Sequence, residues 1–229
     1  MPINIAMDGP VGAGKSAVAG RVAQELGILH LDTGAMYRAL ALHVLRAGVD
    51  PAQEEAACAA CADARVEVRY EDGAQRTLLG GEDVSGLIRT PEVSMATSTL
   101  SQWPQVRERM VALQRAIAAE HDVLLDGRDI GTRVLPNATA KFYLTASPEE
   151  RARRRCAQYR QAGREADFEA VLREVNARDE QDMHRALDPL RRAEDAVEID
   201  STDLTLEQVV NLIAGLSRAE AMKARGART

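Results

Sequence analysis

A glycine-rich loop that joins a strand to a helix constrains this chain more than any other feature. The apolar run Ile3 to Met7 predicts a buried strand, and Lys15 to Leu26 predicts the helix that follows. The residues between them fit the pattern G-x-x-x-x-G-K-[ST]. A plain glycine turn is the alternative interpretation, but this loop stands between a strand and a helix, as the phosphate-binding motif requires. The chain is therefore expected to begin with a strand–loop–helix unit of an α/β fold.

The loop predicts a nucleoside triphosphate ligand. Its glycines allow successive backbone N–H groups to point inward at a phosphate, and the next helix presents the positive end of its dipole to the same anion. Lys15 adds a positive charge near the β- and γ-phosphates, and Ser16 offers its hydroxyl to Mg²⁺. The group that receives the phosphate is left open by the loop itself.

Composition narrows the class of protein. The net charge of −6 argues against a nucleic-acid partner, although a phosphate ligand needs only a local positive site. Lys15, Lys141 and Lys223 are the lysines, and the rest of the 29 basic residues are arginines, so a lysine inside the loop indicates a specific role. No apolar run has the length of a membrane span and no secretory segment is visible. With three cysteines, an odd number, the expected location is the cytoplasm.

Alternating strands and helices predict a parallel sheet with helices on both faces. Residues 64–90 interrupt this order, because alternating polarity and an Asp72-Gly73 turn predict a small antiparallel insert. A helix is expected over 148–161, with Ser147 as its N-cap, and residues 217–229 are expected to form a frayed tail. The other expected strands are 28–31, 123–125, 141–144 and 197–199, and the other expected helices are 36–46, 91–100, 104–120, 167–185 and 206–216.

Two motifs place polar side chains after apolar strands, where ligands bind in parallel sheets. The first, LDTGAMYR at 31–38, brings a carboxylate, a hydroxyl, a phenol and a guanidinium to the start of a helix. Its alternative interpretation is a helix cap formed by Asp32 or Thr33. The second, DGRDIGT at 126–132, puts Asp126 where an acid near a metal is common. A glycine-rich turn with a surface ion pair is the alternative there.

Arginines are concentrated in two later segments. Residues 149–155 carry an arginine run, which is either a solvated face or a cationic helix that stabilises a transferring phosphoryl group. Arg178, Asp182 and Arg185 are spaced at i, i+4 and i+7, so they share one helical face. They form either an exposed ladder of ion pairs or a grip on phosphates and a sugar hydroxyl.

Taken in order, these motifs resemble those of bacterial cytidylate kinases, within the nucleoside monophosphate kinases. The resemblance covers about residues 3–216 and is carried by GPVGAGKS, LDTGAMYRALA, GEDVSGLIRTPEVS, DGRDIGT, EERARRR and RDEQDMHRALDPL. It implies transfer of the γ-phosphate of ATP to CMP or dCMP with Mg²⁺, in a monomer. It also implies one P-loop kinase domain over 1–229, with a monophosphate-binding insert at about 64–90 and a short helical lid at about 147–164.

The resemblance assigns roles residue by residue. The ATP-binding positions it implies are Gly9, Pro10, Val11, Gly12, Ala13, Gly14, Lys15, Ser16 and Ala17, with Ser16 on the metal. The acceptor positions it implies are Thr33, Tyr37, Arg38, Ser98, Arg107, Arg128, Asp129, Arg178, Asp182 and Arg185. Catalytic charge is implied for Lys15, Arg128 and Arg185 and for lid arginines among Arg151, Arg154 and Arg155.

Three other functions compete with this interpretation. The first is a P-loop kinase of another small acceptor, such as shikimate, but this alternative does not explain the 64–90 insert or the GEDVSGLIRT run. A GTP-dependent switch would carry an N-K-x-D motif, which the sequence lacks. A non-catalytic nucleotide-binding module would not need Lys15, Ser16, Asp126 and the arginine runs together.

Overall fold

The computed structural model describes residues 2–71, 73–161 and 163–226. These residues form two compact units. Unit 1 contains the residues up to Leu29 together with those from His121 onward, and unit 2 runs from His30 to Glu120.

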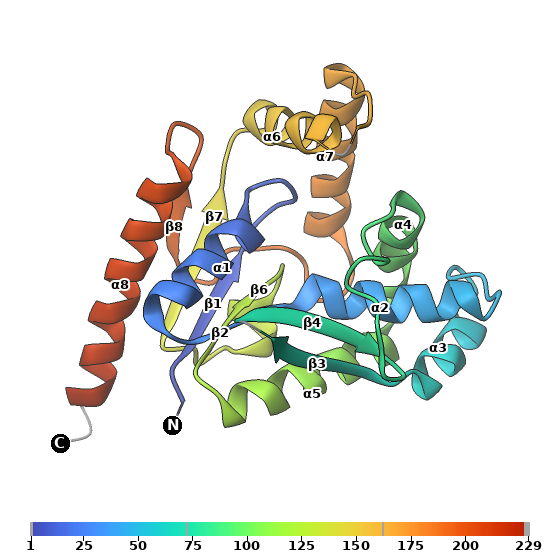
Figure 1. The fold of residues 1–229 in the computed structure, drawn as a ribbon, viewed down its shortest axis with the longest axis horizontal. Helices are drawn as coiled ribbons and strands as arrows, with labels where there is room; N and C mark the ends of the chain where they lie inside the picture. The colour runs from blue at the N-terminus through green and yellow to red at the C-terminus, as the bar shows by residue number, and fades with distance from the viewer. Residues whose placement is uncertain (1, 72, 162, 227–229) are drawn as a thin grey trace. The chain divides into compact units, whose positions relative to one another are not determined.

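A parallel sheet forms the centre of unit 1 (Figure 1). Its strands lie in the order β6-β1-β7-β8, and a fifth strand, β2, begins in unit 1 at the β6 edge and carries the chain into unit 2. The bounds are Asn4–Asp8 for β1, Leu29–Asp32 for β2, Val123–Asp126 for β6, Ala140–Thr145 for β7 and Val197–Asp200 for β8. In this register Met7 is level with Asp126, so the carboxyl ends of β1 and β6 meet at one edge of the sheet. That edge is where ligands bind in this kind of sheet.

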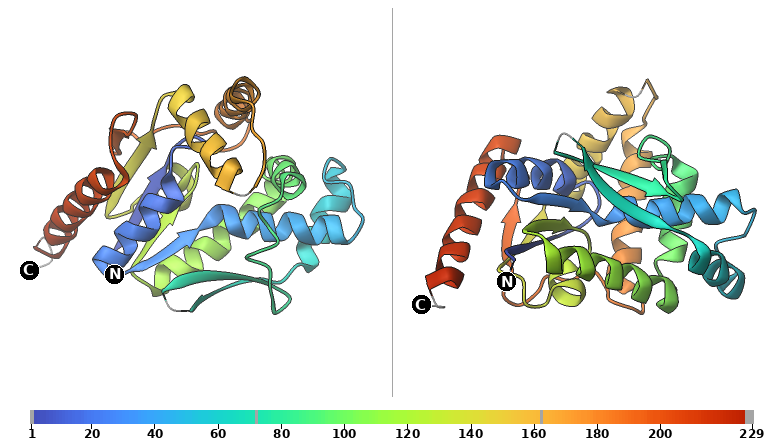
Figure 2. Two further views of the ribbon diagram at one scale, coloured as in Figure 1. Left: turned by 45° about the horizontal axis from the view of Figure 1, so that its top comes forward. Right: turned by 60° about the horizontal axis from the view of Figure 1, so that its bottom comes forward.

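Helices α1 (Lys15–Leu26) and α8 (Leu206–Gly226) lie side by side against this sheet (Figures 1 and 2). Val18 and Val22 of α1 and Ile213 of α8 bury their side chains with Phe142 of β7 in the main core of unit 1. Burial of such apolar side chains stabilises by roughly 1.5–3 kcal/mol each. The loop before α1 is thereby fixed on a well-packed base.

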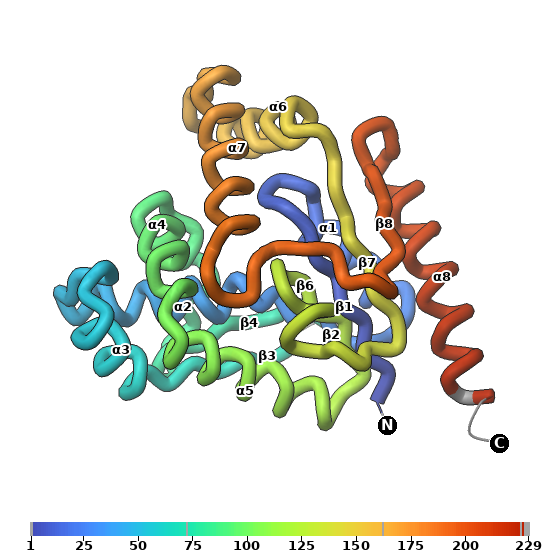
Figure 3. The backbone as a smooth tube through the Cα atoms, turned by 180° about the vertical axis from the view of Figure 1, so that it is seen from behind, coloured from blue at the N-terminus to red at the C-terminus, as the bar shows by residue number. Residues whose placement is uncertain are grey.

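Helices α6 (Pro148–Gln161) and α7 (Phe168–His184) pack against each other through a second apolar cluster that includes Ala152, Cys156 and Val175. A short π-helix, η1 (Ile130–Val134), follows β6. Figure 3 shows the irregular segment 185–196 that connects α7 to β8. No helix in the described parts of the chain is long and apolar enough to cross a bilayer.

Unit 2 combines helices with an antiparallel sheet (Figure 2). Its helices are α2 (Thr33–Arg46), α3 (Glu54–Asp63), α4 (Pro91–Leu100) and α5 (Pro104–Glu120). Its sheet has the order β3 (Val66–Glu71), β4 (Ala74–Leu79) and β5 (Glu82–Asp83). Helix α2 packs against α4 and against β4 and therefore forms the centre of this unit.

Side-chain caps explain where several helices begin. Ser147 accepts a hydrogen bond from the backbone N–H of Glu150, as its N-cap position predicts. Thr205 and Gln208 each accept from the other's backbone N–H at the start of α8, which is a capping box. Gly27, with φ of 66°, ends α1 in the left-handed region.

The structure confirms the predicted α/β class, a parallel sheet flanked by helices with a small antiparallel sheet. Two expectations were wrong. Arg185 does not share the helical face of Arg178 and Asp182, because α7 ends at His184 and Arg185 has an extended backbone. Helix α8 does not end at Leu216 but continues to Gly226. Residues 217–225 contain no glycine or proline and are rich in alanine, which favours continuation of the helix, and Arg218 forms an ion pair with Glu25 of α1 along the way. Residues 227–229 of the expected tail, and Asp72 of the expected turn, lie outside the described residues.

Candidate functional site

The phosphate loop spans β1 and α1, and its geometry depends on glycine. Gly9 has φ of 150°, and a Cβ at this position would lie 2.0 Å from the carbonyl oxygen of Leu144. Gly12 has φ of 77°, and its Cβ would lie 3.2 Å from the Cβ of Arg151. Gly14, with φ of 90°, is the N-cap of α1. The glycine pattern is therefore explained by both backbone conformation and close packing against β7 and α6.

Lys15 folds back over this loop. Its Nζ donates to the carbonyl oxygens of Gly9 and Pro10, each at 2.7 Å, and the side chain is buried. Burial, followed by the nearby positive charge of Arg128, lowers the pKa of Lys15 to about 7. The carboxylates of Asp126 and Asp182 act in the opposite direction. Lys15 is thus within electrostatic range of residues from both β6 and α7.

Ser16 and Asp126 form a pair of oxygen ligands suited to Mg²⁺. The Ser16 Oγ donates to Asp126 Oδ2 at 2.8 Å, and Asp126 is buried at the end of β6. Mg²⁺ prefers oxygen ligands and is often held by one or two carboxylates together with phosphates and water. Among the described residues, no cluster of three His, Cys, Asp or Glu side chains is placed to hold a metal. This pair therefore fits an ion that arrives with a nucleotide.

Asp8 fixes the loop that follows β6, a role that the sequence analysis did not assign. Its two carboxylate oxygens accept from the backbone N–H groups of Ile130 and Gly131, both at 2.7 Å. Burial raises the pKa of Asp8 to about 6, although these two hydrogen bonds oppose the shift. The available signal was a carboxylate that ends an apolar strand directly before the first glycine of the motif.

Five of the residues expected at the acceptor site come together in unit 1. Asp182 of α7 accepts from Nε of Arg128 at 2.8 Å and from Nε of Arg178 at 3.3 Å. Asp129 pairs with Arg185, whose Nη2 lies 3.2 Å from Oδ1. The arrangement supplies three guanidinium groups against two carboxylates, which suits an anionic ligand with hydroxyl groups.

The charges in this cluster stabilise one another. Burial disfavours ionisation of Asp182, but the Arg128 and Arg178 guanidiniums outweigh it and lower the pKa of this carboxyl. Burial also disfavours the charged form of Arg128, and the carboxylate of Asp182 raises its pKa in turn. Asp182 and Arg128 therefore stabilise each other's charged forms, whereas burial lowers the pKa of Arg178.

The three candidate lid arginines differ in their surroundings. Arg151 is buried against Asp179 and also donates to the carbonyl oxygen of Val11 at 3.1 Å. Arg154 donates to Ala13 O at 3.3 Å and to the Ser201 carbonyl at 2.6 Å, so it too lies against the phosphate loop. Arg155 instead donates from Nε to the Tyr159 hydroxyl at 2.9 Å.

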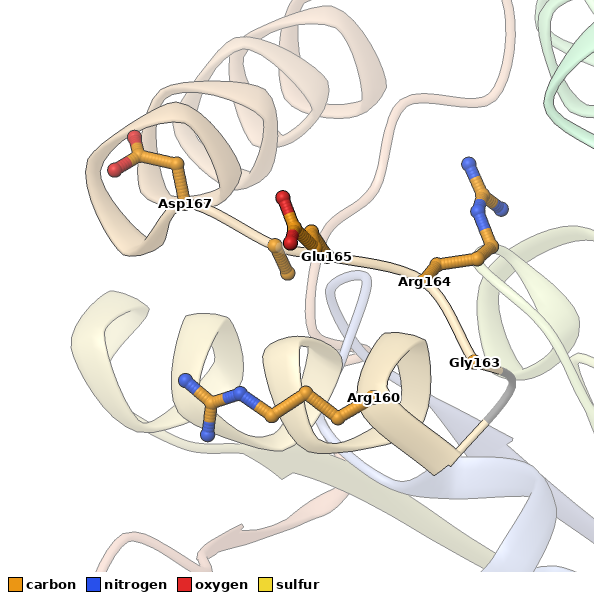
Figure 4. Close-up of a pocket in the computed structure, with 6 residues that line it drawn as sticks. Arg160, Gly163, Arg164, Glu165 and Asp167 are labelled. Atoms are coloured by element: carbon orange, nitrogen blue, oxygen red, sulfur yellow. The ribbon is translucent and has the colours of Figure 1, made fainter.

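An open pocket lies at the other end of α6, in the connection to α7 (Figure 4). It is lined by Arg160, Gly163, Arg164, Glu165, Ala166 and Asp167. Arg160 lies nine residues along α6 from Arg151, about 14 Å at the rise of an α-helix. Figure 4 shows Arg160 and Arg164 pointing in different directions, so the pocket has no converging cations. None of its lining residues belongs to the phosphate loop.

Unit 2 carries the remaining predicted residues, and Asp32 organises their first group. Asp32 caps α2 by accepting from Ala35 N at 2.9 Å and also accepts from Arg38 Nη2 at 3.0 Å. Arg89 donates to the same carboxylate at 3.1 Å. Thr33, Tyr37 and Arg38 all lie on the first turns of α2. The structure confirms the cap interpretation of LDTGAMYR, and the same carboxylate also orients Arg38. The site interpretation of this motif stays a prediction.

Ser98 and Arg107 are buried on α4 and α5 of unit 2. Ser98 donates to the carbonyl of Ser94 at 3.3 Å, and Arg107 donates to the carbonyl of Ser101 at 3.4 Å. Asp179 and Arg89 are the other residues that sequence reasoning missed, although both lie within motifs that it used, RDEQDMHRALDPL and GEDVSGLIRTPEVS. Asp179 is next to Arg178, and Arg89 is part of the GEDVSGLIRT run.

The chain is similar to known proteins in both sequence and fold. The chain is 52% identical to the cytidylate kinase of Symbiobacterium thermophilum over 211 residues, which is 91% of this chain and 93% of that protein. It is 48% identical to the cytidylate kinase of Mycobacterium avium, over 96% of this chain and 97% of that protein. A gluconokinase structure from Sinorhizobium meliloti aligns with a TM-score of 0.51 at 15% identity, over 98% of this chain and 97% of that chain, which supports the fold alone. The family model described as cytidylate kinase matches residues 5–219, and the chain belongs to the cytidylate kinase family.

Proposed function

We propose that this chain transfers the γ-phosphate of ATP to CMP or dCMP, giving ADP and CDP or dCDP. Family membership supports the reaction, and one observation connects the reaction to particular residues of this chain. Lys15 of the phosphate loop is within electrostatic range of Arg128 and Asp182, which belong to the predicted acceptor cluster. Direct phosphoryl transfer requires a donor site and an acceptor site that are close enough for the charges of one to act on the other.

On the donor side, the loop 9–17 would bind the triphosphate through its backbone N–H groups, with Lys15 at the β- and γ-phosphates. The Ser16 and Asp126 oxygens would hold Mg²⁺, which would supply neutralisation of phosphate charge when bound. Asp8 would keep residues 130 and 131 in place beside the loop. No protein nucleophile is needed, because the acceptor phosphate oxygen attacks the γ-phosphorus directly.

On the acceptor side, unit 1 would contribute Arg128 and Arg185 to the monophosphate, with Asp182 and Arg178 at the sugar and phosphate. Asp182 orients two of these arginines by accepting from their Nε atoms. Such a carboxylate fixes a guanidinium before the ligand arrives, so less side-chain entropy is lost on binding. Asp129, which pairs with Arg185, would face the cytosine.

Unit 2 would contribute the other acceptor ligands. Arg38, oriented by Asp32, would bind the monophosphate, and Thr33 and Tyr37 lie on the same turns of α2. Ser98 and Arg107, both buried polar groups, would recognise the cytosine. A site built to hydrogen-bond a base rejects an analogue that leaves such groups unpaired.

Arg154 and Arg155 are proposed as lid arginines that stabilise charge on the transferring phosphoryl group. Arg154 is supported by its contact with the phosphate loop at Ala13. Arg155 is supported by its position one residue further along the same helix. We further propose that the enzyme acts in the cytoplasm as a monomer, in keeping with its three free cysteines and with the family resemblance.

A coupled assay of ADP release tests the proposal, with Mg-ATP and a panel of CMP, dCMP, UMP, AMP, GMP and shikimate. Fast turnover with CMP and dCMP is expected. Lys15→Ala is the matched active-site variant, and its turnover should fall by roughly 10³-fold or more while it remains folded. Preference for another acceptor would overturn the roles of Ser98, Arg107 and Asp129. Absence of turnover with every acceptor would favour a nucleotide-binding module instead.

A further inference from the structure

Arg151 and Asp179 form a buried, bidentate ion pair between α6 and α7. The Arg151 Nη1 lies 3.0 Å from Asp179 Oδ1, and Nη2 lies 2.6 Å from Oδ2. Their exposed fractions are 3% and 7%. A guanidinium and a carboxylate in this geometry satisfy each other's charge in the protein interior.

The remaining donors of Arg151 reach two other segments. Its Nε donates to the carbonyl of Ala146, just after β7, at 2.9 Å, and Nη1 donates to the carbonyl of Val11 in the phosphate loop. The backbone of Arg151 also lies against the same loop, because a Cβ on Gly12 would be 3.3 Å from the Arg151 carbonyl oxygen. One side chain thus connects the end of β7, the middle of the phosphate loop and α7.

Asp179 places this connection one helical turn from the acceptor cluster. It stands directly after Arg178 and three residues before Asp182 on α7. Displacement of Asp179 would therefore move the residues that orient Arg128. Apolar packing already joins α6 to α7 nearby, through Cys156 and Val175, so the charged pair is not required for contact between these helices.

We infer that Arg151 and Asp179 are a pair of positioning residues that set the phosphate loop at a fixed distance from α7. Arg151 acts through the Val11 carbonyl and is not itself a ligand of phosphate. The inference rests on the proposed role of the loop in binding ATP. Its consequence is that Asp179, although it lies outside the phosphate loop, contributes as much to kcat/KM for ATP as Arg151 does.

The pair is tested by removing both charges together and one at a time. Arg151→Met, Asp179→Leu and the double variant are compared with wild type for kcat, KM for ATP and KM for CMP, well below their melting midpoints. Arg151→Gln and Asp179→Asn, which are uncharged and closer in shape, give the same comparison if an apolar variant fails to fold, and Arg151→Lys is a further variant that keeps the positive charge. The matched control is Arg153→Ala, an exposed arginine of the same helix that pairs with Glu150 on the surface.

We expect kcat/KM for ATP to fall by about 10- to 100-fold in both single variants and by no more than this in the double variant. KM for CMP should change less, because the pair touches the loop directly but reaches Asp182 through a turn of helix. Arg153→Ala should behave as wild type. Arg151→Lys should recover part of the loss, because an ammonium can still donate to the Val11 carbonyl.

Two results would overturn the inference. The first is a folded double variant with wild-type kcat/KM for ATP, which would reduce the pair to a stabilising contact. The second is a much larger loss in the Arg151 variant than in the Asp179 variant, which would make Arg151 a direct phosphate ligand. Lys15→Ala belongs in the same experiment, since an active Lys15→Ala enzyme would refute the role of the loop rather than that of the pair.

Discussion

Unit 1 and unit 2 hold their polar site residues in different ways. In unit 1 several buried carboxylates each hold a different partner. Asp8 holds two backbone N–H groups, Asp126 holds Ser16, Asp179 holds Arg151, and Asp182 holds two arginines. In unit 2 a single carboxylate, Asp32, caps α2 and binds both Arg38 and Arg89.

This difference predicts how each unit responds to the loss of one carboxylate. The contacts of unit 1 join residues far apart in sequence, such as Ser16 with Asp126, so they stabilise the tertiary fold and the site together. Because they are distributed, loss of one carboxylate should remove one function and spare the others. Loss of Asp32 should instead disturb a helix start and two arginines at once.

Gly9→Ala in unit 1 should have the largest effect, because it alters both folding and activity. The new Cβ would overlap the Leu144 carbonyl, which belongs to a central strand and has no room to move. We expect a loss of more than about 3 kcal/mol in the free energy of unfolding, and loss of activity. Urea unfolding measures the first and ADP release the second.

Gly215→Ala is the matched control, since nothing lies within 4 Å of that added Cβ on α8. It should stabilise the protein by roughly 0.5–1 kcal/mol, because alanine favours a helix over glycine. A Gly9→Ala protein of normal stability would show that the distributed contacts of unit 1 tolerate a backbone shift.

Asp32→Ala should be the most damaging change in unit 2. It removes a helix cap and leaves the Arg38 guanidinium without its carboxylate partner, so we expect kcat/KM for CMP to fall by about 10²-fold. KM for ATP should change much less. The kinetic constants for both substrates are the measurement, and Glu82→Ala is the control because Glu82 pairs with Arg46 of α2 on the surface. Equal losses of kcat/KM for ATP and for CMP would contradict the assignment of Asp32 to the CMP site alone.

Sequence reasoning located most elements because their limits are local. Helix α1 begins at Lys15 and ends at Leu26 as expected, since Gly14 and Gly27 both take left-handed backbone conformations at its ends. Ser147 and Thr205 gave similar signals. The end of α8 was missed because no cap residue marks it, and its contacts with the rest of the protein, such as the pair of Arg218 with Glu25, join residues 193 positions apart in sequence.

The site shows the same limit. The spacing of Arg178 and Asp182 placed them on one face, and the structure brings them within hydrogen-bond distance. The arginines between 151 and 155 look alike in sequence, yet Arg151 is buried and Arg153 is exposed. The apolar residues Ala152, Cys156 and Tyr159 indicate which face of α6 is buried, but nothing in the sequence indicates that Arg151 pairs with Asp179, 28 positions away.

Asp8 gives a prediction about pH that tests whether burial or hydrogen bonding governs the unit 1 carboxylates. Its pKa of about 6 lies above the ordinary value of 3.8. The folded state then binds more protons than the unfolded state between these values, so its stabilising contribution is complete below about pH 4 and is lost as pH rises through 6. The loss is roughly 3 kcal/mol at most.

The measurement is the free energy of unfolding of wild type and Asp8→Asn from about pH 4 to about pH 8, without nucleotide. Titrating groups that do not interact with Asp8 cancel in the difference, which therefore reports Asp8 together with its electrostatic neighbour Lys15. Wild type should lose stability relative to Asp8→Asn as pH rises. A gain would mean that the Ile130 and Gly131 N–H groups outweigh burial and that the carboxylate is ionised at little cost.

Changes at the extended end of α8 should have the smallest effect, and they test whether stability outside both clusters is independent of catalysis. Arg218 pairs with Glu25 at 2.8 Å, but both side chains are well exposed, so Arg218→Ala should cost only about 0.5 kcal/mol. Ser217 is buried, and its hydroxyl has no hydrogen-bond partner among the described residues, so Ser217→Ala should stabilise by about 0.5–1 kcal/mol. Thermal melting resolves these opposite signs, and both variants should keep wild-type constants for ATP and CMP. A kinetic change in either would mean that α8 acts on the phosphate loop through α1, and that the unit 1 site depends on more than its buried carboxylates.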